Sequence, residues 1–318
     1  MNRLQRVWIL AAAAMLACPA APLAADGERI WDPQANQWVA APEPKEGTPA
    51  GELAIVRQGL RNGRPKAAIK AADSFLSRYP TDPQREQVLL LAGQAEMQQG
   101  DYLDAYDYFE QQIAEFPGGR DFEQALNREY EIGNAFVSGR KRKTLWIIPV
   151  GAEEKGLEIL TRIAEHAPGS EIAQKALMRI GDYHYAQGQW PQAVDAYDNF
   201  VRLFGQTDAA AQARLNAARA TFAQFISVQH DDTPLLEARQ RFRSFAEAYP
   251  ERAQQVNISG VLAQIADARA EKTFRIAEFY RRTDRPQAAE YYFRLVRKEF
   301  PETRWARQAA VQLGQEAE

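Results

Sequence analysis

The sequence predicts an all-α solenoid of about five to six stacked helix pairs, with a C-terminal capping helix, over residues 51–318. Two observations carry this prediction. A 13-residue unit recurs six times at intervals of 37 to 51 residues, a spacing typical of stacked helical or β repeats. Mostly apolar residues inside the units follow steps of four, three and four, with Gln112 as an exception in the second unit, and these steps place them on one face of an α-helix.

Residues 1–25 are expected to form a secretory signal peptide. A basic start, MNRLQR, precedes an apolar stretch of 11 residues, VWILAAAAMLA, and a segment of small residues. The stretch is too short for a membrane-spanning helix, which needs about 20 apolar residues. Two outcomes remain open. Cys18, the one cysteine of the chain, ends a lipobox-like run and is a candidate for lipidation, whereas the small residues before Asp26 suit ordinary cleavage.

Residues 26–50 are expected to be a linker, because proline and glycine are frequent in APEPKEGTPAG. Trp31 and Trp38 flank a turn-like centre in this linker, and two interpretations remain open. The two tryptophans belong to a small hairpin, or they anchor the linker on the first helices.

The repeated unit predicts a helix with a constant buried face. Phe109 and Phe293 lie four residues after the start of their units, and Phe75, Phe200 and Phe245 lie seven residues after it. We expect all five to belong to the repeat core. The six units are AIKAADSFLSRYP (68–80), AYDYFEQQIAEFP (105–117), GLEILTRIAEHAP (156–168), AVDAYDNFVRLFG (193–205), ARQRFRSFAEAYP (238–250) and AEYYFRLVRKEFP (289–301).

The last residue of each unit predicts where its helix ends. Five units close with proline, which cannot continue a helix and disfavours helical geometry in the residue before it. Gly205 replaces proline in the fourth unit and is expected to end the helix as a C-cap.

A partner helix is expected upstream of each unit. In the second and fourth repeats the pattern of glycine, aromatic residue, alanine and aromatic residue extends across both helices, and it is typical of the tetratricopeptide repeat. Small residues allow two helices to approach closely, and aromatic rings fill the space between pairs. The matching positions are Gly93, Gly100, Tyr102, Ala105 and Phe109 in one repeat and Gly181, Gly188, Trp190, Ala193 and Tyr197 in the other.

The segment GRKRKTLWIIPVG, residues 139–151, lengthens the turn inside the third repeat. Four cations stand beside a run of apolar residues, and three roles remain open: a loop packed on the solenoid, a contact with the outer-membrane surface, or a partner-docking element. The contact candidates are Arg140, Lys141, Arg142, Lys143 and Trp146.

Composition and motifs argue against other classes of function. A net charge of −3 does not favour nucleic-acid binding. The three histidines, His166, His184 and His230, are widely separated, so we predict no metal site, and no motif indicates a cofactor or catalytic nucleophile. The carboxylates of DYLDAYDYFE (101–110) are expected on a solvated helix face. Thr233 in HDDTP is expected to cap a helix, with Pro234 as its first residue.

The export signal and the repeats resemble a known family. The second helices ending in RYP, EFP, AYP and EFP, with the phrases APGSEIAQKALMRIGDYHYAQGQW and FPETRWARQAA, are similar to the BamD family of outer-membrane β-barrel assembly lipoproteins. The resemblance implies a non-enzymatic periplasmic scaffold for client or partner polypeptides, including outer-membrane barrel assembly proteins, with an outer-membrane anchor if Cys18 is lipidated. The alternative is an adaptor for cell-wall synthesis or division like CpoB, which carries similar repeats.

Overall fold

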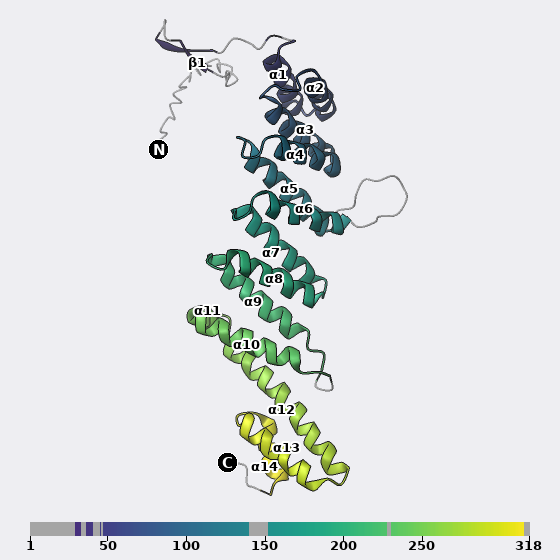
Figure 1. Cartoon of the computed structure of the whole chain (residues 1–318), viewed down its shortest axis with the longest axis vertical. Helices are drawn as coiled ribbons and strands as arrows, with labels where there is room; N and C mark the ends of the chain where they lie inside the picture. The colour runs from purple at the N-terminus through teal and green to yellow at the C-terminus, as the bar shows by residue number, and fades with distance from the viewer. Residues whose placement is uncertain are drawn as a thin grey trace, which may run out of the picture.

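The protein is an elongated stack of helices that runs from α1 at one end to α14 at the other (Figure 1). The computed structural model describes residues 29–32, 36–40, 45, 47–139, 152–227 and 230–314. Fourteen helices lie within these ranges, and each one packs mainly on its neighbours in sequence. The predicted fold class, an all-α tetratricopeptide-repeat solenoid, is confirmed.

Six helix pairs account for most of the described chain. In each pair a first helix is followed by a second helix, which contains one of the 13-residue units. The pairs are α1 (Pro49–Arg61) with α2 (Pro65–Arg78), α3 (Arg85–Gln99) with α4 (Tyr102–Glu115), α5 (Phe122–Val137) with α6 (Ala152–His166), α7 (Glu171–Ala186) with α8 (Trp190–Phe204), α9 (Asp208–Ala223) with α10 (Thr233–Ala248), and α12 (Ile258–Arg282) with α13 (Pro286–Glu299).

The remaining helices fill the last part of the stack. The short α11 (Pro250–Gln255) precedes a 25-residue α12, and together they accommodate the longer spacing before the sixth unit. The final helix, α14 (Arg304–Gln312), packs on both α12 and α13. It covers the apolar end of the solenoid, as expected of a capping helix.

Close approach of paired helices depends on glycine. A Cβ atom on Gly181 of α7 would lie 2.5 Å from Cε1 of Tyr197 on α8, and a Cβ on Gly93 of α3 would overlap the ring of Phe109 on α4. Both rings are almost fully buried. The ring of one helix therefore occupies the space that a side chain on its partner would need.

Helix ends follow local chemistry, with one correction to the sequence analysis. Gly205 is the C-cap of α8, as predicted, and its φ of −60° and ψ of −12° are right-handed. Thr233 is the first residue of α10 rather than its cap. A carboxylate oxygen of Asp231 accepts hydrogen bonds from the Thr233 backbone nitrogen and hydroxyl, at 3.1 and 3.0 Å. The N-cap residue is Asp232. The sequence HDDTP offers two aspartates and a threonine as capping residues, so sequence alone did not decide among them.

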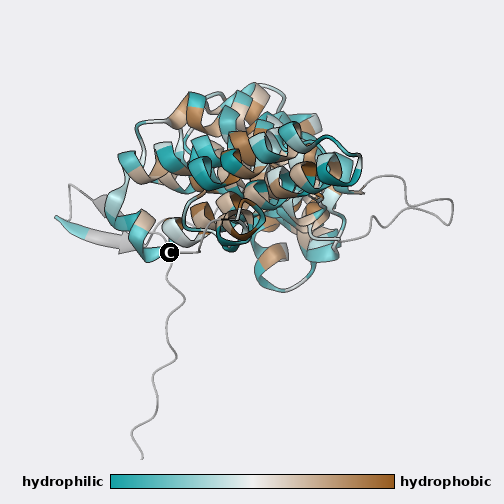
Figure 2. Cartoon of the chain, turned by 90° about the horizontal axis from the view of Figure 1, so that it is seen from below, coloured by the Kyte–Doolittle hydropathy of each residue, from teal (hydrophilic) through white to brown (hydrophobic). Residues whose placement is uncertain are grey.

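The stack has distinguishable inner and outer sides. The backbones of first helices in consecutive repeats approach each other, α1 with α3, α5 with α7 and α7 with α9, whereas the backbones of consecutive second helices in the described ranges lie farther apart. Elements on the inside of a curved stack are closer together, so the first helices line the inner face. Seen from one end, polar and apolar segments alternate around the helices (Figure 2), as expected when each helix buries one face.

A small antiparallel hairpin precedes the helices. Strand β1 (Arg29–Asp32) pairs with β2 (Gln37–Ala40), and Trp31 lies opposite Trp38 in the register. The sequence left two interpretations open, and the antiparallel pairing of β1 with β2 corresponds to the hairpin.

Candidate partner-binding grooves

The residues singled out by sequence fall into two groups. Within the described ranges, the five core phenylalanines are all buried, with exposed fractions between 0 and 3%. They hold neighbouring helices together and are not available to a ligand. The lipidation candidate, Cys18, and the contact candidates Arg140, Lys141, Arg142, Lys143 and Trp146 lie outside the described residues.

An inner groove of about 360 Å³ crosses three consecutive first helices, α5, α7 and α9. Met178 and Ala209 give it an apolar lining, and the buried Phe200 of α8 lies beneath. The groove exists because small and apolar residues on these helices leave a depression between larger polar side chains. The polar residues around it are Tyr130, Glu171, Gln174, Lys175, Arg179 and Asp182.

The polar rim of this inner groove is held in place by hydrogen bonds. Nε of Arg179 donates to the side-chain oxygen of Asn134 at 2.6 Å, and Nη2 donates to the hydroxyl of Ser138 at 3.0 Å. Asp182 accepts a hydrogen bond from the Tyr197 hydroxyl at 2.6 Å. These contacts join α5, α7 and α8, so the rim is positioned before a ligand arrives. A preorganised rim loses less side-chain entropy on binding.

On the outer face, carboxylates at one position of the 13-residue unit link consecutive repeats. The sixth residue of the first, second and fourth 13-residue units is acidic, and each acid contacts the second helix of the next repeat. Asp73 accepts from the Tyr108 hydroxyl at 2.5 Å, and Asp198 accepts from Arg241. We call these contacts the outer stitches. They join repeats by polar contacts above the buried phenylalanines.

Glu110 forms the second of these outer stitches. Its carboxylate accepts from Nη1 of Arg162 and lies 3.2 Å from Nε2 of His166, both on α6, and it also accepts from the Tyr106 hydroxyl at 2.7 Å. The predicted solvated face for the 101–110 carboxylates is therefore wrong at Glu110, whose side chain is only 18% exposed. Sequence spacing described one helix and could not include the neighbouring repeat.

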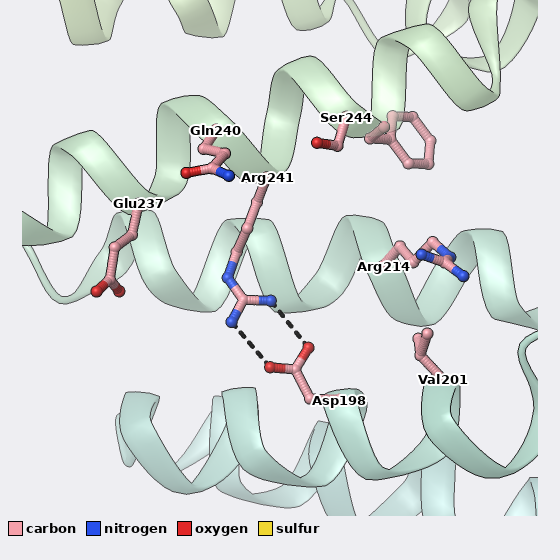
Figure 3. Close-up of a pocket in the computed structure, with 8 residues that line it drawn as sticks. Asp198, Val201, Arg214, Glu237, Gln240, Arg241 and Ser244 are labelled. Atoms are coloured by element: carbon pink, nitrogen blue, oxygen red, sulfur yellow. Dashed lines mark hydrogen bonds and ion pairs between the residues drawn. The ribbon is translucent and has the colours of Figure 1, made fainter.

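The outer stitch between α8 and α10 borders a second groove, of about 440 Å³ (Figure 3). Arg241 reaches across from α10, and its Nη1 and Nη2 atoms lie 2.8 Å from the two carboxylate oxygens of Asp198. Glu237 and Gln240 lie beside Arg241, and Arg214 of α9 extends into the space between the helices (Figure 3). Charges of both signs line this groove, and its central guanidinium is already neutralised.

A buried acid lies next to the Glu110 stitch. Glu129 of α5 has no exposed surface, and neither of its carboxylate oxygens has a hydrogen-bond partner in the described structure. Burial, followed by the negative charge of Glu110, raises the pKa of Glu129 to about 9. Glu129 is therefore a neutral acid at pH 7. The described ranges contain no group of three histidine, cysteine or acidic side chains arranged to hold a metal ion.

The grooves suit the recognition of polypeptides. An apolar floor with a polar rim, spread over several repeats, presents an extended surface rather than an enclosed pocket. Sequence reasoning located the core but missed the groove residues and the outer stitches. The recurrence of an acid at the sixth position of three units was visible in the sequence and was a usable signal for the stitches. In the part of the chain that the structure describes, no helix combines the length and apolar character needed to cross a bilayer.

The chain matches two known protein families over separate parts of its length. Residues 152–317, just over half of the chain, match the YfiO family, described as an outer membrane lipoprotein. Residues 53–120 match a tetratricopeptide repeat family. Over 146 residues the chain is 22% identical to a Caulobacter vibrioides protein named outer membrane protein assembly factor BamD, covering 46% of this chain and 48% of that protein. The alignment thus spans about half the length of this curated relative.

Solved structures with related folds are also repeat proteins. The C-terminal part of a tetratricopeptide repeat-containing protein from Cytophaga hutchinsonii is 15% identical, with 83% of this chain and 88% of that chain covered and a TM-score of 0.39. A tetratricopeptide repeat protein from Parabacteroides merdae is 13% identical, with 83% and 98% covered and a TM-score of 0.36.

Proposed function

Because the chain belongs to the YfiO family of outer membrane lipoproteins, we propose that it is a non-enzymatic scaffold of the cell envelope that holds polypeptide segments during outer membrane protein assembly. The tetratricopeptide repeat is a protein-interaction fold, and the chain therefore has protein partners. The role in assembly is supported by the family match and by the name of the Caulobacter vibrioides relative.

The observation that carries the proposal is the inner groove over α5, α7 and α9. It offers apolar contact through Met178 and Ala209, and donors and acceptors through Arg179 and Asp182. An extended segment of a client or partner satisfies both kinds of surface, because its side chains enter the apolar floor while its backbone groups face the rim. Most of the groove falls inside the part of the chain that matches the YfiO family.

The place of action follows from the same proposal. The expected signal peptide exports the chain to the periplasm, and cleavage before Cys18 with lipidation of that cysteine attaches the chain to the outer membrane, whereas cleavage before Asp26 leaves it without a lipid. The proline- and glycine-rich residues 26–50 then act as the tether between the lipid and the solenoid.

Site-specific photocrosslinking in living cells tests this function. A photoreactive residue at Met178, in the inner groove, is expected to crosslink to a component or client of outer-membrane barrel assembly. The matched control is Leu203, which is 53% exposed on α8 and does not line the groove. Crosslinks at both positions to the same protein would show that the groove is not selective. If cell-wall synthases were the only proteins crosslinked at Met178, the assembly role would be contradicted.

A further inference from the structure

A cluster of cations lies where the fifth repeat carries a cation in place of the acid of the outer stitch. The sixth unit position is acidic in the first, second and fourth units, Thr161 in the third and Arg243 in the fifth. Tyr108 and Arg241, which receive the first and third stitches, are the fourth residues of their units, and the fourth residue of the sixth unit is Tyr292. No outer stitch of this kind can form between the fifth and sixth repeats, because neither residue is an acid.

Other cations lie around Arg243. Arg239 precedes it by one helical turn on α10, so both side chains leave the same face. On the adjoining α12, the guanidinium of Arg269 lies 5.3 Å over the ring of Phe300, and Lys272 is one turn further along. Helices α10 and α12 pack against each other. We call Arg239, Arg243, Arg269 and Lys272 the basic cluster.

The acids near the basic cluster do not neutralise it. Asp232 accepts from Nζ of Lys272 at 2.9 Å, and its second oxygen lies 3.8 Å from Nε of Arg269. Glu299 is the other acid that acts on Arg239. Asp231 also acts on Lys272. Three carboxylates therefore lie among the four cations, and the ion pairs that they form are with Lys272 and Arg269. In the described structure, neither Arg239 nor Arg243 forms an ion pair, and Nε of Arg269 is buried without a hydrogen-bond acceptor.

The electrostatic state of Arg239 agrees with this excess of positive charge. Burial and the positive charges of Arg269 and Arg243 lower the pKa of Arg239. In the neighbouring groove, by contrast, the hydrogen bonds to Asp198 raise the pKa of Arg241 (Figure 3). The two arginines of α10 thus differ in one respect: Arg241 has a carboxylate partner, and Arg239 lies beside other cations.

We propose that the basic cluster is a docking site for an acidic segment of a partner protein, whose aspartate or glutamate side chains replace the missing carboxylate of the outer stitch. Arginine pairs with carboxylates through two parallel hydrogen bonds, as Arg241 does with Asp198. The partner's acid completes a contact that the chain makes internally elsewhere. None of the four cations lines the inner groove, so the proposal goes beyond the proposed function.

A binding experiment with a defined probe tests the site. A fluorescent ten-residue oligoglutamate peptide is titrated with the full chain, and an oligoglutamine peptide serves as the uncharged probe. We expect oligoglutamate to bind in low salt and to bind about tenfold more weakly to the Arg239→Gln/Arg243→Gln variant, since charge-assisted hydrogen bonds are lost. The control variant, Arg61→Gln/Arg64→Gln, removes two exposed cations of the first repeat and should bind like wild type.

A second variant tests the missing carboxylate directly. Arg243→Glu restores an acid at the sixth unit position, and it should abolish oligoglutamate binding while keeping or raising the melting temperature, because like-charge repulsion is relieved. A folded Arg243→Glu variant that still binds the peptide would overturn the proposal. The proposal would also be overturned if the Arg61→Gln/Arg64→Gln control lost as much binding as Arg239→Gln/Arg243→Gln, because binding would then depend only on the net charge of the chain. Phosphatidylglycerol vesicles serve as a further probe, and cluster variants that lose binding to these vesicles but keep binding to oligoglutamate would also overturn the proposal.

Discussion

Arg241 of α10 and Asp198 of α8 form a bidentate ion pair between the fifth and fourth repeats, with both nitrogen–oxygen distances at 2.8 Å. The two side chains are 33 and 46% exposed, so solvent weakens their attraction. In a double-mutant cycle with Asp198→Ala and Arg241→Ala, we expect a coupling free energy of about 0.5–1 kcal/mol. Denaturant unfolding of the four proteins measures it. Additive effects of the two changes would mean that the pair does not join the repeats.

Phe200 and Phe245 occupy the same unit position in different repeats, and both are buried. Substituting either one with alanine should lower the free energy of unfolding by about 3–5 kcal/mol, because a cavity remains where the ring packed. Leu203→Ala is the matched control on α8, since this leucine is 53% exposed and should cost little. Thermal unfolding compares the three variants. A melting temperature in Phe200→Ala equal to that of the control would contradict the repeat packing.

Glu129 should make stability depend on pH. Its pKa is about 9 in the folded chain and near 4.5 when exposed, so the unfolded chain releases this proton first as the pH rises. The contribution of the neutral acid is fully present below pH 4.5 and is lost as the pH rises to about 9, at up to about 1.4 kcal/mol per pH unit.

The variant Glu129→Gln removes this titration. Between pH 6 and 8 we expect wild type to lose more unfolding free energy than Glu129→Gln does. Glu131→Gln, at an exposed position of the same helix, should behave like wild type. Unfolding curves at several pH values provide the comparison, and identical pH dependence in all three proteins would show that Glu129 is ionised in the folded chain.

Mass spectrometry of the mature N-terminus decides the proposed anchor. If Cys18 is lipidated, the mature chain begins at Cys18, carries acyl groups and partitions with membranes. Cys18→Ser should then release the protein into the soluble fraction. A wild-type chain that begins with an unmodified Asp26 would eliminate the lipoprotein hypothesis.

The 139–151 segment keeps its three possible roles, which two variants separate. Replacing Arg140, Lys141, Arg142 and Lys143 with serine should abolish salt-sensitive binding to anionic vesicles if lipid is the target. Trp146→Ala should weaken a protein complex with little dependence on salt if a partner is the target. Wild-type binding by both variants, to vesicles and to copurified partners, would leave a packed loop as the role.

The partners that meet between repeats could not be read from the sequence, although the recurring acid at the sixth unit position was visible there. Glu110 meets His166 across 56 residues, and Asp198 meets Arg241 across 43. Which face of one helix meets the next repeat depends on the rotation between repeats, and that rotation is set by many packed side chains together. The burial of Glu129 is hidden for the same reason, because an acid in a helical pattern is ordinarily assigned to solvent.

The sequence by itself determined the helix pairs, the position of each second helix and the burial of its phenylalanines, because helical period and proline termination are local properties that each segment carries alone. Only the tertiary structure decided the inner groove, the outer stitches, the neutral acid at Glu129 and the excess cations beside Arg243. Each of these depends on which side chains from different repeats come within a few ångströms of one another, and charge and desolvation act over that distance rather than along the chain.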